Sequence, residues 1–288
     1  MQNVWIYEEL IMEEYIDLHV HSNISDGTLS PTEVVKSAKE MGLFAIALTD
    51  HDTIDGIEEA LRAGEKHDIK VIPGIEISAD YKGGDLHILG FDIDYKNDEF
   101  VKKIAICRDS RYNRNLKMVE KINEQGFPLT WEIMLERFGD NSITRAHFAK
   151  YLLDEGYVSS KEEAFLKYLN PGCPCYVSRD KVTPEQAISM IKEANGHPVL
   201  AHPMLYKMTR EQIESVIVML KGYGLEGIEA VYSLNTPEDD DFLLKVAKRH
   251  DLFITGGSDF HGSIKPDIQI GKGRGNLIIT KDMCKMLF

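Results

Sequence analysis

Two histidines separated by one residue, His19 and His21, have the types and spacing needed for metal chemistry. They close a short apolar run, and alternate residues of a β-strand point to the same face, so both imidazoles can reach one ion. Two half-buried strand histidines would give the same pattern, so this pair alone does not decide between metal binding and packing. Asp26 follows closely, in the sequence Ser-Asp-Gly, and adds a carboxylate.

Histidines and carboxylates recur in five later apolar runs or directly after them. The candidate ligands in these places are His51, Glu76, His87, His202, Asp259 and His261. A buried carboxylate such as Glu76 is costly unless it is paired or bound to a metal. Imidazole and carboxylate without thiolate form the ligand set of Zn, Mn or Fe in hydrolytic sites. Six strand ends that each supply such a residue therefore predict a metal centre.

The elements that would position these residues are short strands alternating with helices. The predicted strands are Tyr15–His21, Phe44–Thr49, Val71–Ile77, Leu86–Ile93, Pro198–His202, Gly227–Tyr232, Leu252–Thr255 and Asn276–Thr280. The intervening helices are predicted from about Pro31 to Gly42, and over Ile57–His67, Arg210–Gly222 and Pro237–His250. This alternation predicts an α/β fold with a parallel sheet and right-handed crossovers. Seven or eight such units favour a closed or distorted barrel over an open sheet.

The alternation is interrupted by a stretch with helical patterns only. Helices are predicted there over Phe100–Gln125, Trp131–Phe138, Arg145–Glu155, Lys161–Leu169 and Pro184–Ala194. We therefore expect an N-terminal extension (1–14), a first barrel part (15–94), a helical insertion or lid (95–195) and a second barrel part (196–288).

The composition is that of an ordinary globular protein, and its charge is unevenly distributed. The 288 residues include 33 Lys and Arg against 47 Asp and Glu, for a net charge of −14, yet residues 95–195 alone carry +1. The acidic balance argues against non-specific coating of long nucleic acid. No apolar run is long enough to span a membrane, and the first residues do not resemble a secretory signal. Four cysteines do not make a disulfide scaffold, so we expect a cytoplasmic protein.

Taken together, these motifs resemble those of the PHP-domain phosphoesterases, the polymerase and histidinol phosphatase family. The resemblance runs from residue 15 to about residue 262 and is greatest to the small stand-alone members, which hydrolyse nucleoside 3′,5′-bisphosphates, short RNA 5′ ends or cyclic phosphodiesters. It implies a distorted (β/α)7 TIM-like barrel with two to three divalent ions of Mn, Fe or Zn.

The resemblance also implies a ligand set. The first metal would take His19, His21 and Asp259, with Glu76 bridging to the second. The second would add His87 and His202. The third would take Asp26, His51 and His261. Glu76, Asp259 and His261 would be the catalytic residues around an attacking hydroxide held by the metals, and Asp50 and Asp52 would orient His51.

Substrate-binding residues are expected mainly in the insertion. Arg108, Arg111 and Arg114 recur every three residues and so lie near one helix face, although a solvated face would give the same spacing. Arg145 and His147 match an Arg-x-His that reaches the substrate phosphate in the related enzymes. Asn235 lies in a segment that resembles a substrate-side loop, where relatives often have histidine.

The sequence therefore predicts a metal-dependent phosphoesterase acting on a nucleoside 3′,5′-bisphosphate or a short RNA 5′ end. Three alternatives remain: a cyclic phosphodiesterase or sugar-phosphate phosphatase, a metal-binding regulatory module without turnover, and an amidohydrolase. The last would need a carboxylated lysine at a strand end, and none of the predicted strand ends offers a lysine.

Overall fold

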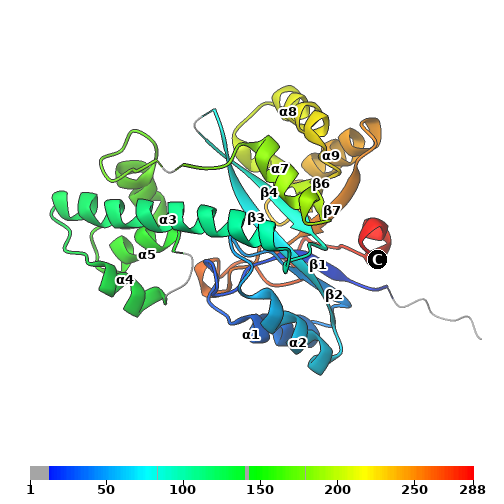
Figure 1. Ribbon diagram of the computed structural model, residues 1–288, viewed down its shortest axis with the longest axis horizontal. Coiled ribbons are helices and arrows are strands. Elements are labelled where there is room, and N and C mark those ends of the chain that lie inside the picture. Colours follow the sequence, from blue (N-terminus) through cyan, green and yellow to red (C-terminus); the bar gives the residue numbers. More distant parts are fainter. Residues whose placement is uncertain (1–12, 83, 140–142, 179) are drawn as a thin grey trace, which may run out of the picture.

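The computed structural model describes residues 13–82, 84–139, 143–178 and 180–288, and these form a seven-stranded barrel with a helical extension (Figure 1). The strands are paired in chain order: β1 (Ile16–Val20), β2 (Ala45–Leu48), β3 (Lys70–Tyr81), β4 (Gly84–Phe91), β5 (His197–Leu200), β6 (Gly227–Tyr232) and β7 (Phe253–Gly257). The first and last strands meet where the His21 amide donates to the Phe260 carbonyl and the Asp259 amide to the His19 carbonyl, at 2.9 and 2.8 Å. The predicted distorted TIM-like barrel is thus confirmed.

Close approach of β7 to β1 depends on a glycine. A Cβ at Gly257 would lie 2.2 Å from the Cβ of His19, so no larger residue fits without moving the strand that carries the first histidine pair. The glycine therefore contributes directly to the position of a predicted ligand.

Strand β4 contradicts the prediction of a wholly parallel sheet. It pairs antiparallel with both β3 and β5, whereas the remaining pairs are parallel. Only two residues separate β3 from β4, and parallel neighbours need a crossover of a dozen residues or more. The reversal has a functional consequence, because it places His87 opposite Ser78 of β3, two residues from Glu76.

The predicted strand Asn276–Thr280 is also wrong. This segment is irregular and makes one isolated bridge, from Thr280 to Tyr15. Leu277 and Ile279 are buried beneath the barrel, so the apolar pattern reflects core packing rather than a strand.

Helices cover the outside of the barrel: α1 (Pro31–Glu40), α2 (Ile57–His67), α7 (Pro184–Glu193), α8 (Arg210–Tyr223) and α9 (Pro237–Arg249). Four of them begin at a capping box in which the cap side chain and the third helical residue satisfy each other's backbone amides; the caps are Ser30, Thr183, Thr209 and Thr236. Short 3₁₀ helices span Pro203–Tyr206, Gly262–Ile264 and Lys281–Leu287.

The insertion between β4 and β5 extends away from the barrel. It contains α3 (Asp98–Glu124), α4 (Trp131–Phe138), α5 (Arg145–Asp154), α6 (Lys161–Ala164) and a π-helical turn (Phe165–Leu169). Its outer part has its own apolar core, from Met118 to Val177, while the first half of α3 and all of α7 pack on the barrel. Figure 1 shows α3 running from the barrel to α4 and α5, so one continuous helix joins the two parts. Within the described residues, no helix combines the length and apolarity needed to cross a membrane.

Candidate metal centre

Nine predicted ligands converge at one end of the barrel, around the carboxylate of Glu76. Its Oε2 lies 3.3 Å from His19 Nε2, 3.2 Å from His21 Nε2 and 3.1 Å from His51 Nδ1. Its Oε1 lies 2.8 Å from His87 Nδ1 and 3.0 Å from His202 Nε2. One buried carboxylate thus faces five imidazoles from four segments of the chain. We call the nine residues the histidine–carboxylate cluster.

Two further carboxylates complete the histidine–carboxylate cluster. Asp26 Oδ1 lies 3.1 Å from His261 Nε2, and Asp26 Oδ2 lies 3.7 Å from His51 Nε2. Asp259 Oδ1 lies 3.4 Å from His21 Nε2 and 3.7 Å from His19 Nε2. The ligands therefore form one continuous group rather than separate sites.

The donor atoms fit divalent cations. Several buried ring nitrogens and one carboxylate oxygen in the histidine–carboxylate cluster lack a hydrogen-bond partner: His19 Nε2, His21 Nε2, His51 Nδ1, His202 Nδ1 and Glu76 Oε2. Buried polar atoms are rarely left in this way unless a ligand satisfies them. Three overlapping groups have one donor atom per residue within 4.8 Å of the others: His19, His21 and Glu76; His51, Glu76 and His87; and His21, Asp26, His51 and His261.

The pKa values of His19 and Glu76 point to the same conclusion, whereas burial lowers the pKa of His51 to about 3 and also lowers that of His261. Burial alone lowers the pKa of His19, but Glu229, Glu76 and Asp259 outweigh it and hold that pKa well above its usual value. Burial likewise opposes ionisation of Glu76, and the surrounding imidazoles nevertheless hold its pKa well below the usual value. In the absence of a metal, a proton on His19 balances the negative charge of the nearby carboxylates. A bound cation would take over that role, so we expect metal binding to release protons.

Glu229 supports the cluster from behind and was missed by the sequence analysis. Its Oε1 lies 2.9 Å from His19 Nδ1, and its Oε2 accepts the backbone amide of His202 at 2.7 Å. This contact orients the other ring nitrogen of His19 toward Glu76. The signal was present in the sequence: Glu229 is a lone acidic residue inside an apolar strand, as Glu76 is.

Asp50 and Asp52 have other partners than the predicted one, His51. Asp50 accepts hydrogen bonds from the backbone and hydroxyl of Ser22 and from the Ser25 hydroxyl, so it holds the loop after the first histidine pair. Asp52 accepts the Ser78 amide at 2.8 Å and pairs with Arg111. The two aspartates flank His51 and diverge to opposite sides of it.

Asp259 has two hydrogen-bond donors that sequence patterns do not reveal. The Tyr232 hydroxyl and the Lys265 ammonium donate to its Oδ2 at 2.7 and 2.6 Å, leaving Oδ1 directed at the histidines. Tyr232 reaches Asp259 from the neighbouring strand β6, and Lys265 follows Asp259 by six residues along the chain.

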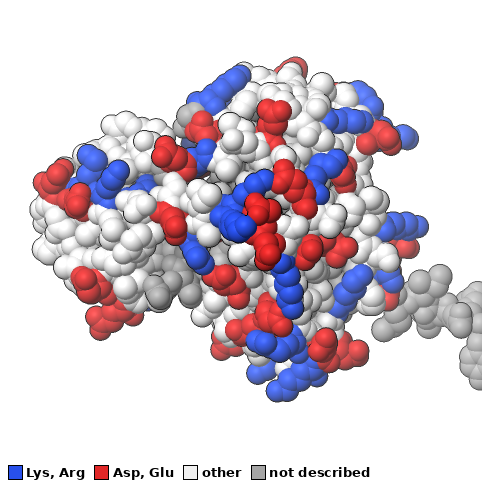
Figure 2. All heavy atoms as spheres, in the orientation of Figure 1, with Lys and Arg blue, Asp and Glu red and all other residues white. Residues whose placement is uncertain are grey.

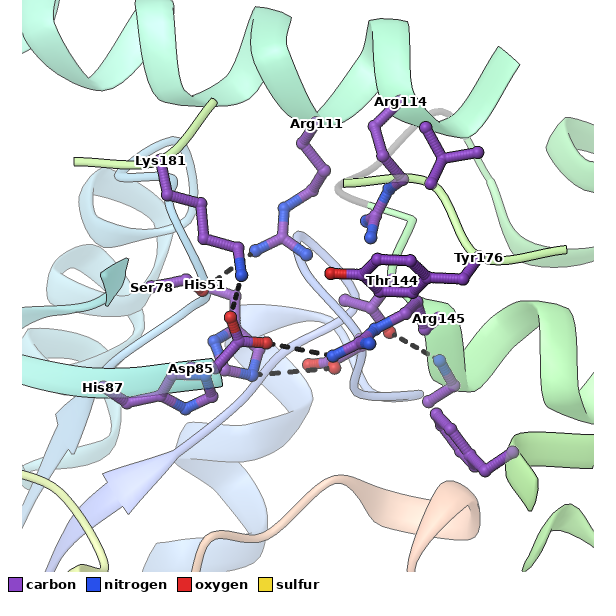
Figure 3. A pocket seen from close by; sticks show the side chains of 14 residues that line it. His51, Ser78, Asp85, His87, Arg111, Arg114, Thr144, Arg145, Tyr176 and Lys181 are labelled. Carbon is purple, nitrogen blue, oxygen red and sulfur yellow. Dashed lines mark hydrogen bonds and ion pairs between the residues drawn. The ribbon is translucent and has the colours of Figure 1, made fainter. Parts of the chain in front are cut away.

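Next to the cluster lies a cavity of about 170 Å³, which we call the arginine pocket. It is lined by Asp26, His51, Ser78, Asp85, His87, Arg111, Arg114, Thr144, Arg145, Ala146, Phe165, Tyr176, Val177 and Lys181. Asp85 lies between two cations, accepting from Arg145 at 2.9 Å and pairing with Lys181 (Figure 3). Four basic side chains, Arg111, Arg114, Arg145 and Lys181, lie beside the predicted metal ligands and can donate hydrogen bonds to an anion.

Of the predicted substrate-binding residues, Arg111 and Arg145 line this pocket, but His147 and Asn235 do not. His147 is buried at the start of α5, where its Nδ1 accepts the Thr144 amide at 3.0 Å; burial lowers its pKa to about 4. Asn235 is buried after β6 and donates to Asp240 at 2.9 Å. Lys181 and Asp85 were missed, since neither belongs to a motif.

A family model described as the PHP domain matches residues 17–170. A 5′-3′ exoribonuclease from Haemophilus influenzae is 36% identical over 87% of this chain and 91% of its own length. A 3′,5′-nucleoside bisphosphate phosphatase from Chromobacterium violaceum is 36% identical over 85% of this chain and 87% of its own length.

A solved structure from Chromobacterium violaceum, described as an amidohydrolase with bound sulfate and no metal, has a TM-score of 0.83 and 36% identity, covering 89% of this chain and 90% of that one. In the described part of the present chain, Lys265 pairs with the predicted ligand Asp259, and Lys181 lines the arginine pocket beside the predicted ligands. Both lie outside the strands and pair with aspartates. This arrangement does not supply the strand-end lysine expected of an amidohydrolase.

Proposed function

Because the chain belongs to the PHP-domain family and is a metal-dependent phosphoesterase, we propose that its substrate is a nucleoside 3′,5′-bisphosphate or the 5′ end of a short RNA. The observation that carries the proposal is the direct contact between the histidine–carboxylate cluster and the arginine pocket, which share Asp26, His51 and His87. If a substrate places one phosphate at the predicted metal site, the adjoining arginine pocket can accept a second anionic group.

The nine predicted ligands would hold two to three divalent ions. Such ions supply a water nucleophile at neutral pH and neutralise charge on the phosphate oxygens. Glu229 fixes His19, and Tyr232 with Lys265 fixes Asp259, so the ligands keep their orientation while a phosphate is bound.

The basic residues of the arginine pocket bind the second phosphate. Arg145 offers a planar fork that can donate two parallel hydrogen bonds, and Lys181 adds a charge on the opposite side of Asp85. Burial lowers the pKa of Lys181, and the charges of Asp80 and Asp52 partly oppose this effect. A dianionic phosphate would compete with Asp85 for both cations.

A small or terminal phosphate suits the face of the molecule that Figure 2 draws. Figure 2 shows acidic and basic side chains interspersed over the face that it draws, without a continuous basic track there for a long duplex. This supports a substrate held at one end.

The experiment measures hydrolysis by the Mn-reconstituted protein through its products, which are inorganic phosphate from a bisphosphate or monoester, a mononucleotide from RNA, and a ring-opened nucleotide from a cyclic nucleotide. The substrates are 3′-phosphoadenosine 5′-phosphate, a 5′-phosphorylated RNA trinucleotide, a 2′,3′-cyclic nucleotide and a plain phosphomonoester. We expect metal-dependent hydrolysis that is fastest with the bisphosphate or the RNA. Fastest turnover of the cyclic nucleotide would favour the cyclic phosphodiesterase instead, and no turnover with metal shown to be bound would overturn the proposal.

A further inference from the structure

A second cavity lies against the arginine pocket and has a different character. Its volume is about 380 Å³, and it is lined by Ile24, Thr53, Asp55, Arg108, Asp109, Arg111, Tyr112, Asn115, Trp131 and Ile143. We call it the aromatic pocket, because the rings of Tyr112 and Trp131 meet edge to face there, with centroids 5.4 Å apart. Tyr112 is 47% exposed, so part of its ring is open to a ligand.

One face of α3 builds much of the aromatic pocket. Arg108, Arg111, Tyr112 and Asn115 are spaced as i, i+3, i+4 and i+7, so they share that face. The three regularly spaced arginines of α3, Arg108, Arg111 and Arg114, lie in different environments. Arg114 lines the arginine pocket, Arg108 pairs with Asp55 at 2.9 Å in the aromatic pocket, and Arg111 lines both.

The two pockets are close enough for one small molecule to occupy both. Besides the shared Arg111, Ile24 of the aromatic pocket is two residues from Asp26, and Thr53 is two residues from His51. Two residues of extended chain span about 7 Å at most. The arginine pocket, at about 170 Å³, is below the roughly 300–1,000 Å³ of pockets that enclose whole organic ligands. A phosphorylated organic substrate must therefore extend beyond it.

We propose that the aromatic pocket binds the nucleobase of a substrate whose phosphate is held in the arginine pocket. This rests on the proposed function and adds the part of the substrate recognised. Every base has a π-face that stacks on aromatic rings, and the Arg108–Asp55 ion pair offers donors and acceptors at the pocket's edge. A sugar phosphate would leave these rings uncovered, so the pocket selects nucleotides.

The test compares substrates with and without a base. Tyr112→Ala should raise KM for 3′-phosphoadenosine 5′-phosphate about tenfold, the loss expected for one base-stacking contact, and leave KM for ribose 5-phosphate within twofold. Tyr223→Ala is the matched control, because Tyr223 is also exposed, at 40%, but lies at the end of α8. An equal change in KM for both substrates, or none for either, would overturn the inference and leave the phosphoesterase proposal intact.

A binding measurement keeps the inference testable if no turnover is detected. Trp131 and Trp5 are the two tryptophans of the chain. Adenosine 5′-monophosphate should quench the fluorescence of the metal-free protein, Trp131→Phe should abolish that quenching, and ribose 5-phosphate should cause none. Quenching that persists in Trp131→Phe, or that ribose 5-phosphate also produces, would place the base elsewhere.

Discussion

The histidine–carboxylate cluster and the arginine pocket touch, yet they are built in different ways. The cluster is carried by the barrel strands and the segments that follow them, and its predicted ligand His19 is held by the buried carboxylate of Glu229. The pocket is built by long side chains from α3, α5 and the loop before α7, and three of them, Arg111, Arg145 and Lys181, pair with aspartates at the barrel. On the proposed function, the barrel would fix the reacting centre and the insertion would supply substrate recognition.

The largest effect should follow removal of the central charge. Glu76→Gln keeps the shape of the side chain but removes the carboxylate that faces five imidazoles. We expect loss of bound metal and a fall in kcat of roughly a thousandfold, because the interaction acts on charge in a buried site. Metal analysis after Mn reconstitution and phosphate-release rates measure the two effects. Full metal content with an unchanged rate would contradict the central role of Glu76.

A smaller effect on metal binding is expected at Glu229, which contacts the predicted ligand His19. Glu229→Gln should weaken metal binding about 10- to 100-fold, since it loosens the orientation of His19 without removing a ligand. Metal titration followed by activity measures this.

The chain offers a matched control for that substitution. Glu226 contacts His197 Nδ1 at 2.7 Å in a similar pair away from the cluster, so Glu226→Gln should leave metal affinity unchanged. If the two variants lost affinity equally, the role of Glu229 would be general stability rather than ligand orientation.

In the arginine pocket the effect should depend on the substrate. Arg145→Ala should raise KM for a nucleoside 3′,5′-bisphosphate by about 10- to 100-fold, the range expected for a charged hydrogen bond, and change the monoester much less. Steady-state kinetics on both substrates measures the difference. Arg137→Ala is the control, because Arg137 forms an exposed ion pair with Glu155. Equal losses on both substrates would remove the second-phosphate role.

The same contrast explains what the sequence could predict. His19 and His202 belong to short motifs at strand ends, and Glu76 lies inside the adjoining strand β3; a barrel brings such positions together, so their meeting follows from the fold. Lys181 and Asp85 meet across 96 residues through the packing of the insertion, and no local pattern records that contact. Strand β4 shows the same limit: its residues predict a strand, but the short connection to β3, not the apolar pattern, decides its direction.

The smallest effect on activity is expected at Asn235, and it tests whether recognition belongs to the insertion alone. The side chain donates to Asp240 at 2.9 Å and does not line the arginine pocket. Asn235→Ala should cost about 1 kcal/mol of stability, seen as a fall in Tm of about 2–4 °C, because a buried hydrogen bond is lost. We expect kcat/KM for the bisphosphate to stay within twofold. A large loss of kcat/KM at an unchanged Tm would instead support the sequence-based prediction of substrate binding, and would mean that the barrel shares in recognition.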